Sequence, residues 1–211
     1  MAYDVEQQES IAALKSWFEA NANWLLAVAL VAAVIVAGNR AWHWYTARES
    51  YAAAALYEQY QQAVVTKDAN KARELAGALL EQHASSVYAA FAALAQARTS
   101  LDAGDIAAAK AQLHWVIDRS DNKELAALAR VRLAGVLLDE KAYEEGLTLL
   151  EAETPKAMAA EFFDRRGDLL FAQGKAAQAR EAYAKALEQA GAQSPLRPVI
   201  QAKFDAIAAT G

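Results

Sequence analysis

The feature that most constrains this chain is a long uncharged segment near its N-terminus. Twenty consecutive residues between Glu19 and Arg40 carry no charged side chain, and the part from Trp24 to Gly38 carries no polar side chain at all. An α-helix rises about 1.5 Å per residue, so residues 22–45 are long enough to cross a hydrocarbon core of about 30 Å. The segment therefore predicts one transmembrane helix at residues 22–45.

Aromatic side chains mark both ends of this predicted span. They are Trp17, Phe18, Trp24, Trp42, Trp44 and Tyr45. Amphipathic rings of this kind prefer the headgroup level of a membrane. A cleaved signal peptide is the alternative, but it would begin with a short basic region, whereas Lys15 is the only base ahead of the span. We therefore expect an uncleaved anchor in contact with the lipid bilayer.

The rest of the chain predicts one all-helical domain. Alanine, the strongest helix former, accounts for 55 of the 211 residues, and only three prolines interrupt the chain. Acids and bases are interspersed at a formal net charge of −5, which argues against a nucleic-acid partner. We expect three parts: an N-terminal segment at residues 1–21, the transmembrane helix at residues 22–45, and a repeat domain at residues 46–211.

Helix pairs recur in the third part at the spacing of a solenoid. Residues 167–187 resemble a tetratricopeptide repeat, with the signature positions occupied by Gly167, Leu170, Gly174, Ala179, Tyr183 and Ala186. Equivalent turns fall 33 residues before Gly174, at Lys141, and a further 37 residues back, at Gly104. A degenerate unit at residues 46–82 and a terminal helix at residues 195–210 complete the pattern. The fold class predicted is an α-solenoid of about three to four helix pairs with a C-terminal capping helix.

One position departs from the repeat pattern. Glu153 stands where a second helix usually carries a small residue. The helix after the span is also unusual, because no Gly or Pro occurs between Gly38 and Gly77. The anchor is thus predicted to continue into the first helix of the repeats, with a kink at residues 46–50 as the alternative.

The concave face of such a solenoid is the expected surface for a partner or client. In the tetratricopeptide register it is lined by Phe91, Leu94, Arg98, Leu101, Leu128, Val131, Leu138, Asp164 and Phe171. This mostly apolar lining suits an extended or partly unfolded polypeptide segment. The terminal helix could instead fold back and fill the face, and the sequence leaves both possibilities open.

A second candidate surface lies in the anchor. Ala29, Ala33, Ala37 and Ala41 recur every four residues. Small residues at this spacing let another membrane helix approach closely. We therefore expect a possible membrane-helix contact along this row.

The sequence lacks the common catalytic motifs. It contains no phosphate-binding glycine loop, no metalloprotease histidine pair and no nucleophile elbow. Its histidines, His43, His83 and His114, are far apart and lack partners at ligand spacing. We expect no catalytic residue, no cofactor and no metal site, so the protein is predicted to be a non-enzymatic binding protein.

The order of the segments matches one known family. An acidic N-terminus with the pattern IAALKSWFEANANWLLAV from Ile11, an anchor ending in Arg40-Ala41-Trp42-His43-Trp44, and a helical repeat domain together resemble the YfgM family. Members of that family are ancillary subunits of the bacterial Sec translocon. The resemblance implies an inner-membrane protein with a cytoplasmic N-terminus and periplasmic repeats. It also implies association with SecYEG, a PpiD-like periplasmic chaperone and emerging secretory clients.

The charges beside the span do not support this orientation. Lys15 is the base on the N-terminal side, whereas Arg40 and Arg48 lie on the C-terminal side, and positive charge favours the cytoplasm. A membrane-tethered adaptor that sequesters a cytoplasmic signalling regulator is therefore the alternative function. Its bait would be either the N-terminal 23 residues or an inward-facing solenoid.

Overall fold

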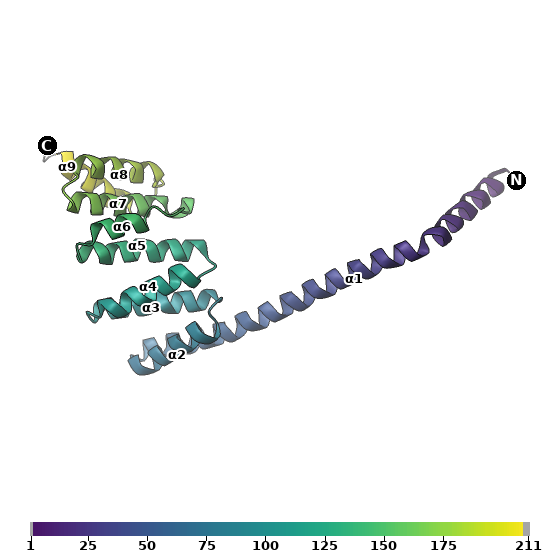
Figure 1. The fold of residues 1–211 in the computed structure, drawn as a ribbon, viewed down its shortest axis with the longest axis horizontal. Helices are drawn as coiled ribbons and strands as arrows, with labels where there is room; N and C mark the ends of the chain where they lie inside the picture. The colour runs from purple at the N-terminus through teal and green to yellow at the C-terminus, as the bar shows by residue number, and fades with distance from the viewer. Residues whose placement is uncertain (1, 209–211) are drawn as a thin grey trace. The chain divides into compact units, whose positions relative to one another are not determined.

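A computed structural model describes residues 2–208 and is all-helical over that range (Figure 1). Its helices are α1 (Ala2–Val65), α2 (Ala69–Gln82), α3 (Val87–Asp102), α4 (Ile106–Arg119), α5 (Lys123–Asp139), α6 (Tyr143–Leu149), α7 (Ala159–Ala172), α8 (Ala176–Gln189) and α9 (Arg197–Ala208), with a 3₁₀ turn at Lys156–Met158. The chain divides into two compact units between Tyr51 and Ala52. Residues 209 and 210 of the predicted terminal helix lie outside the described residues.

The first unit consists of α1 up to Tyr51. Among the described residues, α1 is the helix that is long and apolar enough to cross a membrane, with a mean hydropathy of 2.1 in its most apolar part. Its large apolar side chains are exposed, including Trp24, Leu30 and Val34, whereas a core helix of a water-soluble domain would bury them. Exposed apolar side chains are what a lipid-facing helix requires.

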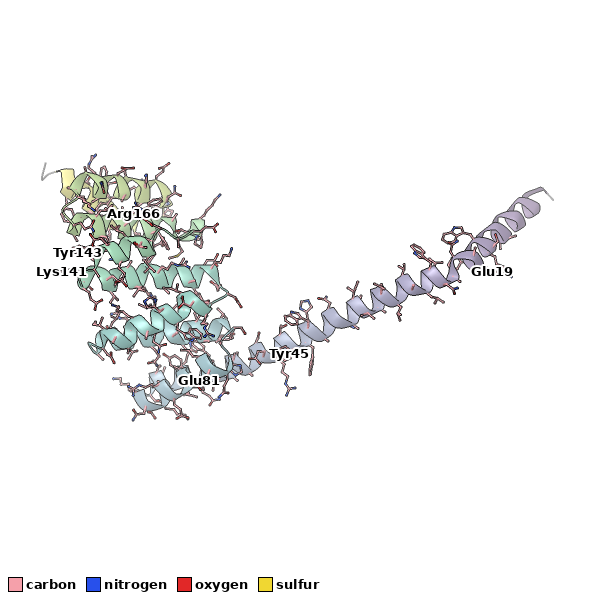
Figure 2. All side chains as sticks on the ribbon, viewed as in Figure 1. Glu19, Tyr45, Glu81, Lys141, Tyr143 and Arg166 are labelled. Carbon is pink, nitrogen blue, oxygen red and sulfur yellow. The ribbon has the colours of Figure 1, made fainter. Side chains whose placement is uncertain are left out.

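Residues 46–50 are helical. The sequence left open whether the anchor helix continues through them or is kinked there. The Thr46 hydroxyl donates hydrogen bonds to the carbonyls of Trp42 (3.0 Å) and His43 (3.1 Å). These bonds satisfy the hydroxyl within the helix, so Thr46 does not have to interrupt it. Figure 2 labels Tyr45 just ahead of this point.

The second unit is a stack of four helix pairs and a terminal helix. The end of α1 pairs with α2, and the following pairs are α3 with α4, α5 with α6, and α7 with α8. Figure 1 shows α3 to α8 stacked in chain order. Helix α9 packs on α8 at the C-terminal end. The predicted all-α solenoid with a capping helix is therefore confirmed, including its degenerate first unit.

The same backbone turn closes all four pairs. Its central residue has a positive φ in each case: Lys67 (58°), Gly104 (77°), Lys141 (62°) and Gly174 (77°). The next amide reaches back five residues, as in the 2.8 Å bond from Asp105 N to Ser100 O and the 2.9 Å bond from Lys175 N to Leu170 O. This arrangement satisfies the last carbonyls of each first helix and reverses the chain within a few residues.

The third pair is incomplete. Helix α6 has seven residues and ends at Leu149, so Glu153 lies in an irregular segment. Pro155 lies two residues later in the same irregular segment. Proline lacks an amide donor and disfavours a helical conformation in the residue before it. Glu153 therefore occupies no helix–helix contact, which explains why a charged residue is tolerated there. Figure 2 labels Lys141 and Tyr143 at the turn into α6.

Candidate binding groove

A groove of about 1020 Å³ lies between α3 and α5, above α4. We call it the α3–α5 groove. It is lined by Phe91, Leu94, Ala95, Ala97, Arg98, Leu101, Ile106, Leu113, Leu125, Leu128, Arg132, Gly135, Val136, Asp139, Glu140 and Arg165. Its volume is at the upper end of the range for sites that bury a small ligand, so several side chains of a polypeptide would fit.

The walls of the groove are apolar because α3 and α5 turn one face of their 3.6-residue repeat toward it. Leu94 is buried in its floor, whereas Leu101 and Leu128 are partly buried against the same core. Phe91 remains 38% exposed at its edge. An apolar partner side chain would therefore gain contact with these residues while removing exposed ring surface from water.

An aromatic cluster extends the apolar surface from Phe91 toward the end of α1. The ring centroid of Tyr57 lies 6.1 Å from that of Phe91 and 5.4 Å from that of Tyr88. Tyr57 also stacks on Tyr60 at 5.6 Å. Burial, followed by the nearby Tyr57, raises the pKa of Tyr60. We call Tyr57, Tyr60, Tyr88 and Phe91 the aromatic cluster.

Most charged residues of the groove have a partner. Arg98 Nε lies 3.0 Å from the Asp102 carboxylate, and Glu140 accepts a 2.7 Å hydrogen bond from Lys110 Nζ, which raises the pKa of Lys110. Arg165 pairs with Asp168 of its own helix. Among the described lining residues, Arg132 and Asp139 are the charged ones that form no such pair.

Arg132 differs from the other arginines of the groove lining. Within the described part of the chain its guanidinium has neither an ion-pair nor a hydrogen-bond partner. Its pKa is lowered, first by burial and then by the like charge of Arg98. An anion placed beside Arg132 would oppose this lowering of the pKa, because an opposite charge favours the charged guanidinium.

Arg165 enters the groove from α7. Its guanidinium carbon would lie 3.4 Å from a Cβ added to Gly135, which is an ordinary van der Waals distance. One terminal nitrogen donates to Asp168 Oδ2 at 3.2 Å, whereas the buried Nε has no partner among the described residues. Arg165 thus packs on Gly135 and contributes an arginine from the next helix pair to the groove lining.

The structure brings together five of the nine residues that the sequence assigned to the concave face. Phe91, Leu94, Arg98, Leu101 and Leu128 all line the α3–α5 groove.

The other four lie elsewhere. Val131 and Leu138 pack against the core that joins α5 to α7, which contains Phe162 and Leu169. Asp164 pairs with Lys203 of α9, and Phe171 is 51% exposed outside the groove.

The difference is a rotation of about one residue on α5. The groove face of α5 continues from Leu128 to Arg132, Gly135 and Asp139, whereas Val131 faces the following pair. Spacing alone missed Arg132 and Arg165, which occupy equivalent places 33 residues apart. A glycine inside a helix, here Gly135, was the available signal for a close approach at this face.

Helix α9 is held by a polar cluster on α7 and α8. Lys203 Nζ lies 2.8 Å from Asp164 Oδ1 and 2.7 Å from Asp168 Oδ1, and Tyr183 donates a 2.8 Å hydrogen bond to Asp168. Arg180 also lies over the Phe204 ring, 4.2 Å from its centroid. No described residue of α9 lines the α3–α5 groove, so this helix caps the stack and leaves the groove open.

The alanine row of the anchor is exposed throughout. Ala29, Ala33, Ala37 and Ala41 all face outward from α1, as do the larger apolar side chains around them. The membrane-helix contact along this row stays a prediction.

Comparisons with known proteins agree with this architecture. The tetratricopeptide repeat-like domain family matches residues 15–209. A protein of Neisseria gonorrhoeae named ancillary SecYEG translocon subunit is 29% identical, covering 98% of this chain and all of its own. Proteins of the same name from Haemophilus influenzae and Escherichia coli are 24% and 25% identical, each over 92% of this chain and over 94% and 91% of their own.

No solved structure matches the chain. The match to the repeat family nevertheless covers almost all of the sequence, and the relatives align over nearly their whole length. Their shared name is that of an ancillary translocon subunit. The chain therefore belongs to the tetratricopeptide repeat-like YfgM family, whose curated members are named ancillary SecYEG translocon subunits.

Proposed function

We propose that this protein is a non-enzymatic accessory of the Sec translocon that binds partner proteins and emerging secretory polypeptides through its helical repeats. The relatives' name supports the accessory role, and the candidate span in α1 indicates a single-pass inner-membrane protein. The repeats would lie in the periplasm and the N-terminus in the cytoplasm.

The observation that carries the proposal is the open α3–α5 groove. It combines an apolar floor with an exposed edge at Phe91, and α9 does not cover it. An unfolded secretory segment exposes apolar side chains that such a groove would remove from water. A PpiD-like chaperone is the second proposed partner, on the strength of the family resemblance.

Site-specific photo-crosslinking in living cells tests the binding surface. A crosslinker at Phe91 or Leu128 is expected to capture emerging secretory chains, and one at Ala33 to capture SecYEG subunits. Phe171 supplies the matched control, because it is an exposed phenylalanine outside the groove. The proposal would be refuted if Phe91 and Phe171 captured secretory chains equally, or if neither secretory chains nor SecYEG subunits were recovered.

Orientation needs its own experiment. A reporter active only in the periplasm, fused after the last residue, is expected to be active. A silent periplasmic reporter, together with capture of a cytoplasmic regulator, would instead establish the membrane-tethered adaptor.

A further inference from the structure

The guanidinium of Arg132 in the α3–α5 groove pairs with no carboxylate in the described part of the protein. Arg132 lies between the apolar walls, and the acids nearest to it in the groove lining are either engaged or distant. Glu140 is held by Lys110 at 2.7 Å. Asp139 is seven residues further along α5, which places its backbone about 10 Å away along the helix.

Two further arginines, Arg98 and Arg165, line the same groove as Arg132 and add positive charge to it. Arg98 carries the same charge and its own acid, Asp102, is on an exposed turn of α3. Arg165 is already engaged with Asp168 on α7. Arg132 is therefore the groove arginine whose guanidinium pairs with no acid among the described residues, and its side chain is exposed to an incoming segment.

We propose that the α3–α5 groove selects polypeptide segments in which an acidic side chain is flanked by apolar ones, with Arg132 binding the carboxylate. This inference rests on the proposed function, because it specifies the occupant of the same groove. The flanking apolar side chains contact Phe91 on one side and Leu128 on the other. A guanidinium and a carboxylate form a charge-assisted, two-pronged hydrogen bond, which gives geometric selectivity as well as affinity.

The groove's composition also excludes simpler occupants. A purely apolar segment would leave Arg132 covered and without a partner, and burying an unpaired charge is unfavourable. A basic segment would be repelled by Arg98 and Arg132 together. Charge complementarity therefore favours an acidic residue within an apolar segment.

Binding of short labelled peptides to the full-length protein in detergent micelles tests the inference. The probe has leucines and serines around a single glutamate, and the matched probes carry glutamine or lysine in its place. The glutamate probe is expected to bind about tenfold more tightly than the glutamine probe at low salt, since a charge-assisted hydrogen bond exceeds a neutral one by roughly that factor. Raising the salt concentration is expected to narrow the difference.

Variants of the protein assign the preference to one residue. Arg132→Gln is expected to abolish the tenfold preference, Arg132→Lys to retain part of it, and Arg132→Glu to transfer it to the lysine probe. Arg130→Gln on the same helix is the control, because Arg130 is outside the groove lining and should leave the preference unchanged. Thermal melting of each variant establishes that it is folded.

Two results would overturn the inference. Equal binding of the glutamate and glutamine probes, or no binding of any probe by folded protein, excludes acid selection by Arg132. If crosslinking from Phe91 still captures secretory chains in that case, the proposed function stands and only the acid selectivity is lost. If neither assay detects a segment in the groove, both are refuted.

Discussion

The ring of Tyr183 on α8 occupies the space that a side chain at Gly167 on α7 would need. A Cβ added to Gly167 would lie 2.6 Å from Cδ1 and 2.8 Å from Cζ of that ring, distances that real Cβ atoms essentially never show. The two residues are the small and large signature positions of the best-formed repeat. Their contact explains why that spacing occurs: the glycine lets the helices approach closely enough for the tyrosine to fill the gap.

Gly167→Ala is expected to destabilise the repeat domain by about 2 kcal/mol, because the added methyl group overpacks a buried contact. Thermal melting of the full chain should show a correspondingly lower midpoint. Gly77→Ala on α2 is the matched control, since nothing lies within 4 Å of an added Cβ there. That change should raise stability by up to about 1 kcal/mol through helix propensity; a loss of stability in the control would contradict this account.

Substitutions at the positive-φ residues of two turns, Gly174 and Lys141, are expected to change stability in opposite directions. Gly174→Ala is expected to cost about 1 kcal/mol, because an alanine must adopt the positive φ of 77°. Lys141→Gly relieves the same strain at φ 62° but increases the freedom of the unfolded chain, so its gain should be smaller than 1 kcal/mol. Urea denaturation curves of the two variants would test this, and a stabilising Gly174→Ala would refute it.

Tyr183 makes stability depend on alkaline pH. Burial first, and the neighbouring Asp168 second, raise its pKa above the usual value of about 10. A raised folded-state pKa contributes stability that is complete below the unfolded pKa and is lost as the pH rises above it. Tyr183→Phe should therefore cost about 1–2 kcal/mol at neutral pH, through the lost hydrogen bond to Asp168, and should flatten the decline above about pH 10.

Some alkaline decline is expected to remain in that variant, because the pKa of Tyr60 is raised as well. Comparing melting midpoints from neutral to alkaline pH for Tyr183→Phe and the unchanged protein measures the difference. Parallel curves would mean that Tyr183 ionises equally in both states.

Lys203→Ala is expected to loosen α9. The lysine bridges Asp164 and Asp168, whose side chains are only 17% and 15% exposed, so its loss leaves Asp164 without this cation and Asp168 with Arg165 alone. We expect a loss of about 2 kcal/mol at neutral pH. Hydrogen exchange of α9 and thermal melting are the measurements.

The effect should shrink as the pH falls. Burial already raises the pKa of Asp164, and removal of Lys203 should raise it further, so protonation relieves the repulsion at mildly acidic pH. Lys185→Ala is the control, because its pair with Glu181 is exposed and should contribute little. An equal loss in both variants would exclude a special role for Lys203.

Much of the fold could be predicted because it depends on local chemistry. The turns at Gly104, Lys141 and Gly174 were found by spacing, and each has the expected left-handed backbone. The first unit, which lacks a glycine at its turn, was recognised only as degenerate, yet Lys67 adopts the same conformation there. The short length of α6 is harder to predict from the sequence, because the sequence does not show how far the helix continues before Pro155.

The groove was harder to predict than the fold. Periodicity identifies an apolar stripe but does not establish which edge of that stripe faces the next pair of helices. Val131 was assigned to the groove and packs instead against the core with Phe162, whereas Arg132, one residue later, lines the groove. Contacts between pairs determine this choice, and they involve residues far apart in the sequence.

The short α6 has a mechanical consequence for the stack. Helices α7, α8 and α9 pack closely on one another, while the contacts from α7 back to α5 and α6 are fewer. The irregular segment that follows α6 thus replaces the rest of a full second helix at this junction. Arg165 of α7 reaches across this junction into the α3–α5 groove, and the neighbouring Asp164 binds Lys203 of α9, so a single helix connects the wall of the groove to the capping helix.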